Sequence, residues 1–129
     1  MLENEVSITV VGEACDGQEA IDVCRQRRPD VVLMDMNLGQ MHGIEATERI
    51  TAELPDLKVL VLSSTDDRVS VLTALDAGAS GYLLKTAAAT EITDAISRIH
   101  NGELVFPPAL SQVVLSAIRR RGAFVGDAR

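Results

Sequence analysis

Two patterns of apolar residues alternate along the sequence. Short runs rich in Val, Ile and Leu indicate buried strands, and longer segments with apolar residues at every third or fourth position indicate amphipathic helices. This alternation is typical of a mostly parallel sheet covered by helices. The predicted strands are 7–14, 30–36, 58–64 and 81–85, and the predicted helices are 16–28, 43–54, 67–77 and 90–101.

The pattern changes after Gly102, where one further helical segment follows the interruption at Pro107 and Pro108. Its apolar residues recur at helical spacing: Leu110, Val113, Val114, Ala117 and Ile118. We therefore divide the chain into a domain over 1–106 and a linker helix with its tail over 107–129. Because no strand follows to cover the apolar face, the helix either folds back on the domain or forms a dimer seam or a linker to another module. The pattern favours neither alternative.

Composition narrows the class of protein. A chain of 129 residues with 47% hydrophobic residues suffices for one core. A net charge of −7 and very few aromatic residues argue against direct nucleic-acid binding by this chain. No apolar run is long enough to span a membrane and no export signal opens the chain, so we expect a cytoplasmic protein without membrane contact. Cys15 and Cys24 lack suitable partners for a soft metal site.

Polar side chains follow three successive strands of the predicted sheet. Asp35 and Asn37 follow the second strand, Ser63 lies at the end of the third, and Lys85 lies at the end of the fourth. Because ligands bind at the carboxyl ends of strands in open α/β sheets, we expect these groups to converge on one crevice. A carboxylate, a hydroxyl and an ammonium at one place suit phosphoryl transfer to Asp35, with Lys85 and Ser63 contacting the phosphoryl oxygens. Mg²⁺ would balance the charge, with Asp35 and the backbone carbonyl of Asn37 as ligands.

At these residues the sequence resembles the receiver domain of two-component response regulators. The resemblance rests on Asp30 to Leu38, "MHG", "VLVLSSTDD", "ALDAGASGYLLK" and the closing helix, and it covers nearly the whole chain. "VVGEACDGQEA" and "NGELVFPPAL" are similar to the receivers attached to LuxR-type helix-turn-helix output domains. The resemblance implies a flavodoxin-like (CheY-like) doubly wound parallel sheet, here incomplete at the N-terminus and followed by an extra C-terminal helix.

The resemblance also implies roles for individual residues. Asp35 is the expected phospho-acceptor, Lys85 the lysine of the site, and Ser63 the switch hydroxyl. Tyr82 matches the aromatic residue that moves with this hydroxyl. The implied function is not enzymatic: a histidine kinase phosphorylates Asp35, and the phosphorylated receiver controls transcription through a DNA-binding output domain that this chain does not contain.

Departures from the family pattern define further expectations. Such receivers begin with a strand that ends in two acidic residues, followed by a helix, and here "MLENE" resembles only the last turn of that helix. The main Mg²⁺ ligands are therefore missing, and Glu13 and Asp16 are poor substitutes. The missing strand belongs between 7–14 and 30–36, so we expect exposed strand edges and a homo-oligomer, with exchanged elements or with the two flanking strands paired directly.

Two other functions compete with this interpretation. A pseudo-receiver that binds a partner without phosphorylation would explain the missing acids, although it leaves Asp35, Ser63 and Lys85 without a role. A haloacid-dehalogenase-like phosphatase also uses an aspartate at a strand end, but its second aspartate is replaced here by Asn37.

Overall fold

The computed structural model describes residues 8–37 and 42–122, in which three parallel strands form one sheet in the order β1-β2-β3. The strands are β1 (Val31–Asp35), β2 (Lys58–Ser63) and β3 (Gly81–Leu84). The helices are α1 (Gly17–Arg27), α2 (Gly43–Glu53), α3 (Arg68–Asp76), α4 (Ala89–His100) and α5 (Ser111–Gly122), with a short 3-10 turn at Pro108–Leu110. These strands and the first four helices confirm the sequence predictions to within a residue at each end. No helix in these ranges is long and apolar enough to cross a membrane.

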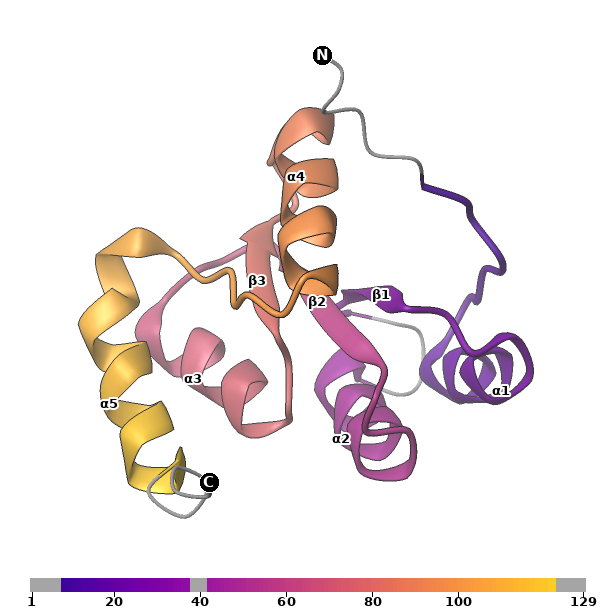
Figure 1. Cartoon of the computed structure of the whole chain (residues 1–129), viewed down its shortest axis with the longest axis horizontal. Coiled ribbons are helices and arrows are strands. Elements are labelled where there is room, and N and C mark those ends of the chain that lie inside the picture. The colour runs from indigo at the N-terminus through magenta and orange to yellow at the C-terminus, as the bar shows by residue number, and fades with distance from the viewer. Residues whose placement is uncertain (1–7, 38–41, 123–129) are drawn as a thin grey trace.

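Helices cover the two faces of the sheet unequally (Figure 1). α4 contacts all three strands and lies on one face, where Leu60, Ala95 and Ile99 form a small buried cluster. On the other face α2 and α3 contact the strands, α1 lies beside α2, and α5 lies beside α3. The arrangement is the receiver-like α/β fold that the sequence predicts.

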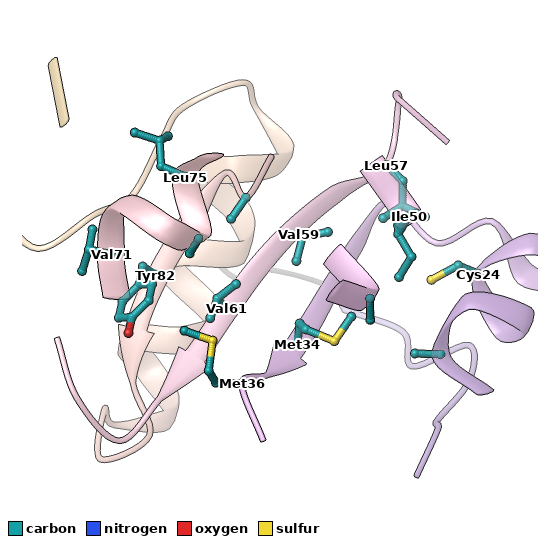
Figure 2. Packing of buried hydrophobic residues seen from close by; sticks show 14 of the residues in the cluster. Cys24, Met34, Met36, Ile50, Leu57, Val59, Val61, Val71, Leu75 and Tyr82 are labelled. Carbon is teal, nitrogen blue, oxygen red and sulfur yellow. The ribbon is translucent and has the colours of Figure 1, made fainter. Parts of the chain in front are cut away.

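The main core lies on the face of the sheet covered by α2 and α3 (Figure 2). Met34 from β1 and Val59 and Val61 from β2 are fully buried or nearly so. Ile50 and Cys24 complete it from α2 and α1, so Cys24 is a packing residue, as its sequence context suggests. This core fixes the strands whose carboxyl ends carry the polar residues of interest.

The C-terminal helix folds back on the domain. Val114 and Ala117 of α5 are buried in the main core, and α5 contacts α3. Leu110 and Ile118 pack partly against the same core. The apolar face of this helix, which the sequence left unassigned, is therefore covered within the chain.

The predicted strand over 7–14 is wrong for the described residues 8–14, which belong to no strand. This segment leads into α1 without joining the sheet (Figure 1). A Cβ on Gly12 would lie 2.7 Å from Val23 and 3.6 Å from Arg27, so the backbone there rests directly on α1. Without a neighbouring strand, the β-branched residues of the segment have no ladder to join. Ser7, the first residue of the prediction, and the "MLENE" stretch lie outside the described residues.

Candidate functional site

The parallel register brings the carboxyl ends of the three strands to one edge of the sheet. Asp35 is level with Leu62 on β2, and Ser63 is level with Leu84 on β3. The N–H of Lys85 donates to the carbonyl of Ser63 at 2.8 Å and so extends this alignment by one residue. The strand ends therefore place Asp35, Ser63 and Lys85 in adjacent rows, as the sequence predicts.

Asp35 and Lys85 are in direct contact. The Lys85 Nζ lies 2.9 Å from the Asp35 Oδ1, and the two side chains are 38% and 42% exposed, respectively. A half-buried ion pair at the mouth of a sheet remains accessible to a small ligand. Phosphoryl transfer to Asp35 with Lys85 as the balancing charge requires the two side chains to lie close together, and they do.

Asn37 contributes to the site through its N–H. This N–H donates to the Asp35 Oδ1 at 2.8 Å, so Asp35 closes a turn on its own backbone two residues further on. From the sequence, Asn37 was expected only as a carbonyl ligand, and this bond was not predicted. The signal was present, because Asp commonly closes such turns where a strand ends.

Opposing effects set the pKa of Asp35. Partial burial raises it, but the hydrogen bond from the Asn37 N–H and then the hydrogen bond and charge of Lys85 outweigh burial, and the net pKa lies below the ordinary value. Asp35 is therefore an anion at neutral pH. Both donors, the Asn37 N–H and the Lys85 Nζ, contact Oδ1 of Asp35, and neither is directed to Oδ2.

Ser63 lies at the end of β2 and is almost fully buried. Its Oγ accepts a long hydrogen bond of 3.3 Å from the N–H of Thr65, which holds the loop after β2 close to the strand end. Lys85 thus contacts Asp35 directly. Ser63 lies at the same edge of the sheet, and its hydroxyl bonds to the loop that follows β2.

Tyr82 is completely buried on β3. Its hydroxyl donates to the carbonyl of Thr65 at 2.6 Å, which links β3 to the same loop that Ser63 holds. Thr65 in turn donates to Asp67, the residue that caps α3. Ser63, Tyr82 and the start of α3 therefore form one connected set of hydrogen bonds.

Gly43 at the start of α2 allows the backbone of α2 to approach the site closely. A Cβ at this position would lie 2.3 Å from the carbonyl oxygen of Asp35 and 2.9 Å from the Cα of Met36. The Gly43 N–H donates to the carbonyl of Met36 at 2.9 Å. From the sequence, Gly43 was expected only as a helix start, because the contact with Asp35 depends on tertiary packing that the sequence does not reveal.

The described residues do not fit a Mg²⁺ ion by themselves. They contain no group of three or more His, Cys, Asp or Glu side chains that could hold a metal. Asp16 caps α1 by accepting from the Glu19 N–H at 2.8 Å, so it is committed to the helix. Asp35 is then outside any group of three such side chains among the described residues, which leaves a small donor set for a cation that prefers six oxygens.

Comparisons with known proteins agree with this geometry. The family described as "Response regulator receiver domain" matches residues 1–97. The response regulator protein VraR of Staphylococcus aureus (strain NCTC 8325 / PS 47) is 40% identical over 120 residues, which is 93% of this chain and 57% of that protein. The chain therefore spans little more than half the length of this curated relative.

Solved receiver structures are similar in fold. A LuxR-family two-component response regulator from Aurantimonas sp. SI85-9A1 has a TM-score of 0.74 and 34% identity, covering 84% of this chain and 77% of that one. The signal receiver domain of the putative response regulator NarL from Mycobacterium tuberculosis has a TM-score of 0.73 and 34% identity, covering 79% of this chain and 82% of that one. With Asp35 and Lys85 paired at the strand ends of such a fold, this chain belongs to the response regulator receiver domain family, in its LuxR-type branch.

Proposed function

We propose that this chain is a phosphorylation-dependent switch in which Asp35 accepts a phosphoryl group from a histidine kinase. The observation that carries the proposal is the 2.9 Å contact between Lys85 Nζ and Asp35 Oδ1. An anionic carboxylate at a strand end, held by an ammonium and a backbone N–H, is an oriented nucleophile. The receiver family to which the chain belongs generally has signalling rather than enzymatic roles.

The proposed transfer balances as a simple displacement. Oδ2 of Asp35 supplies the electron pair that forms the new O–P bond, while the P–N bond of the donor phosphohistidine breaks and its electron pair returns to the imidazole. The Lys85 ammonium then lies within reach of a phosphoryl oxygen and offsets the added negative charge.

Binding of Mg²⁺ is the part of this proposal that the described residues support least. Receiver domains typically bind this ion, whereas the described residues of this chain contain no group of three or more His, Cys, Asp or Glu side chains that could hold it. We therefore propose weak Mg²⁺ binding and inefficient phosphorylation for the chain by itself.

The proposed switch runs through Ser63 and Tyr82. A hydroxyl drawn toward the phosphoryl group would release the Thr65 N–H, and the bond from Tyr82 to the Thr65 carbonyl would carry the change to β3. We propose α3, β3 and α4 as the output surface. The contact of α5 with α3 occupies part of this surface, in keeping with a linker role for 107–129 after a receiver domain over 1–106.

The proposed partners follow from this role. A histidine kinase supplies the phosphoryl group, and a DNA-binding output domain outside this chain reads the switch in the cytoplasm to control transcription. The full-length relatives are longer than this chain, which leaves room for such a domain. We propose a homo-oligomeric receiver.

Phosphotransfer from a purified, autophosphorylated histidine kinase tests the proposal. We expect label on the wild-type chain, none on Asp35→Asn, and wild-type labelling on Asp66→Asn, which changes an exposed acid in the nearby β2–α3 loop. Equal labelling of Asp35→Asn and the wild type would overturn the assignment of Asp35.

A pseudo-receiver is the second candidate function, favoured by the single carboxylate at the site. In that case a partner protein binds the chain without phosphorylation. Its affinity would be the same for the wild type and Asp35→Asn, with or without phosphodonor, whereas the first proposal requires a difference.

A further inference from the structure

Three residues of α2 follow one another at intervals of one helical turn: Gly43, Thr47 and Thr51. Residues at this spacing share one face of a helix. Thr47 is fully buried, and its hydroxyl donates to the Gly43 carbonyl at 2.8 Å. The Thr51 Oγ lies 2.9 Å from the Thr47 carbonyl, so the same contact repeats one turn further on. We call these three residues the α2 ladder.

The amino end of the α2 ladder rests on the backbone at the end of β1. A Cβ on Gly43 would lie 2.3 Å from the Asp35 carbonyl oxygen, so the two backbones are in direct contact. The Gly43 N–H also donates to the Met36 carbonyl at 2.9 Å. No flexible side chain lies between these backbones to absorb a movement. A shift of the backbone at Asp35 therefore has to move the first turn of α2.

The carboxyl end of the α2 ladder meets the turn between α3 and β3, since α2 and α3 lie beside each other (Figure 1). The Thr51 Oγ lies 2.8 Å from the carbonyl of Ala77, the C-cap residue of α3. A Cβ on Gly78 would lie 2.5 Å from the same Oγ. A hydroxyl carries one proton, so Thr51 donates either to the Thr47 carbonyl of its own helix or to the Ala77 carbonyl of α3.

The turn that Thr51 touches has a fixed geometry and leads directly into β3. Gly78 has a positive φ of +102°, and its N–H donates to the Leu75 carbonyl at 3.0 Å. The Ala79 N–H donates to the Ala74 carbonyl at 3.0 Å. This pair of bonds is the Schellman motif, which ends many helices. β3 begins two residues after Ala79 and is directly followed by Lys85, so the turn determines where the strand before Lys85 starts.

We propose that α2 is a strut that couples the backbone of Asp35 to the turn between α3 and β3, with Thr51 as the positioning residue at its far end. Thr51 follows Gly43 by two helical turns, a distance of about 12 Å along the helix. Close-packed interiors have low compressibility and so transmit a displacement over such a distance. The strut links the two strands whose ends carry the ion pair of Asp35 and Lys85.

The strut is separate from the hydrogen bonds of Ser63 and Tyr82. Those bonds reach the amino end of α3 through Thr65 and Asp67, whereas Thr51 contacts its carboxyl end. Use of the strut in signalling rests on the proposed phosphorylation of the chain. The coupling itself is a property of the fold, so it can be measured without a phosphoryl group.

A double-mutant cycle in urea denaturation tests the coupling. Thr51→Val keeps the shape of the side chain and removes the donor, while Gly43→Ala disturbs the contact at the other end of α2. Because Gly43→Ala displaces the whole strut, we expect Thr51→Val to change the unfolding equilibrium constant at least ~3-fold less in the Gly43→Ala background than in the wild type. Independent sites at this distance would instead act additively.

Thr73→Val is the matched control for this cycle. The Thr73 hydroxyl donates to the Val69 carbonyl of its own helix, α3, at 2.7 Å, and this bond does not reach α2. Its effect should be the same in both backgrounds. If the effect of Thr51→Val also agrees within ~3-fold between the two backgrounds, the proposal is overturned.

NMR gives a readout that a purely local role of Thr51 would not change, and it decides the question if Gly43→Ala does not fold. We expect Thr51→Val to shift the amide signal of Gly43, about 12 Å away, as well as that of Gly78. Thr51→Ser, which retains the donor, should restore the Gly43 signal, and Thr73→Val should leave it unchanged. A shift at Gly78 without one at Gly43 would overturn the proposal. Absence of phosphoryl transfer to Asp35 would not affect this result, so the two proposals fail separately.

Discussion

The β3 side and the β1 side of the sheet differ in how far the chain completes them. At β3, Gly81 forms a parallel bridge with Val105, and the Tyr82 N–H donates to the Val105 carbonyl at 2.8 Å, so the edge is paired within the chain. At β1, the described residues leave the edge open beside a groove, with Leu33 exposed. The same asymmetry runs through the site: β3 is followed by Lys85 with its contact formed, whereas β1 supplies Asp35 without further acids.

The difference shows that a sheet edge paired within the chain and a functional site with all its ligands are separate properties of this molecule. The β3 side is satisfied by residues close to it in the sequence, since Val105 follows β3 after one helix. The β1 side needs a strand that the described residues do not provide. We therefore expect the largest losses of stability from changes at β3, and the dependence on metal to arise at the Asp35 end of β1.

The largest expected effect on stability is at Tyr82. Replacing this fully buried side chain by alanine, Tyr82→Ala, should lower the free energy of unfolding by about 3–5 kcal/mol, because it opens a cavity between β3 and α3. Tyr82→Phe keeps the ring and loses the bond to the Thr65 carbonyl, so it should cost only about 0.5–1.5 kcal/mol. Urea denaturation measures both, and equal losses would show that packing of the ring contributes little.

The next effect concerns the ion pair that joins the two sides. Lys85→Ala should slow phosphorylation by about 100-fold or more, since one preorganised cation at the developing charge is lost. Its fold should remain, because Lys85 is exposed at the end of β3. The initial rate with a small-molecule phosphodonor gives the comparison, with Lys58→Ala, at the opposite end of β2, as the control. A rate for Lys85→Ala within twofold of the wild type would remove the lysine from the proposed chemistry.

Gly43→Ala tests how tightly α2 is seated on the β1 side. The added Cβ would meet the Asp35 carbonyl at 2.3 Å, so backbone has to move, and we expect a loss of about 1–3 kcal/mol in unfolding free energy. Gly102→Ala is a useful contrast, because space is open there and only the positive φ of +96° opposes the side chain. If Gly43→Ala proved as stable as the wild type, α2 would not be constrained by Asp35.

The smallest effect is the pH dependence contributed by Asp35. Its pKa is lowered in the folded state, so the carboxylate stabilises the fold above the ordinary pKa and this contribution is lost as the pH falls through the lowered pKa. At 42% exposure, solvent screening keeps the contribution below about 1 kcal/mol. The stability difference between the wild type and Asp35→Asn, followed by urea denaturation from pH 7 downward to about pH 2, should shrink on acidification. A difference that grows instead would contradict the lowered pKa.

The sequence predicted the strands that form, their order along the chain and three residues of the site, because each has a strong local signal. Apolar runs identify β1 and β2, Asp35 and Ser63 end these strands, and Lys85 directly follows β3. The turn from Asp35 to the Asn37 N–H had a local signal that was missed. The approach of Gly43 and the bond from Tyr82 to Thr65 could not be predicted, since each depends on how loops pack.

The segment that was wrongly predicted as a strand shows the same dependence on packing. The segment 8–14 has the composition of a strand, yet strand formation depends on a neighbour, and no strand lies beside it among the described residues. Composition correctly indicated that the segment prefers the strand conformation, but the prediction that it forms a strand was wrong. The sequence likewise did not decide where the C-terminal helix packs, because an apolar face does not specify which surface covers it.

Peptide mapping after treatment with acetyl phosphate tests most directly that Lys85 and Asp35 form a phosphoryl-acceptor site with a weak metal subsite. We predict that the phosphoryl group is found on Asp35 alone, in low yield, and that the yield continues to rise as Mg²⁺ is increased through the millimolar range. A phosphoryl group at any other residue, or a yield at Asp35 that is stoichiometric without high Mg²⁺, would contradict this account.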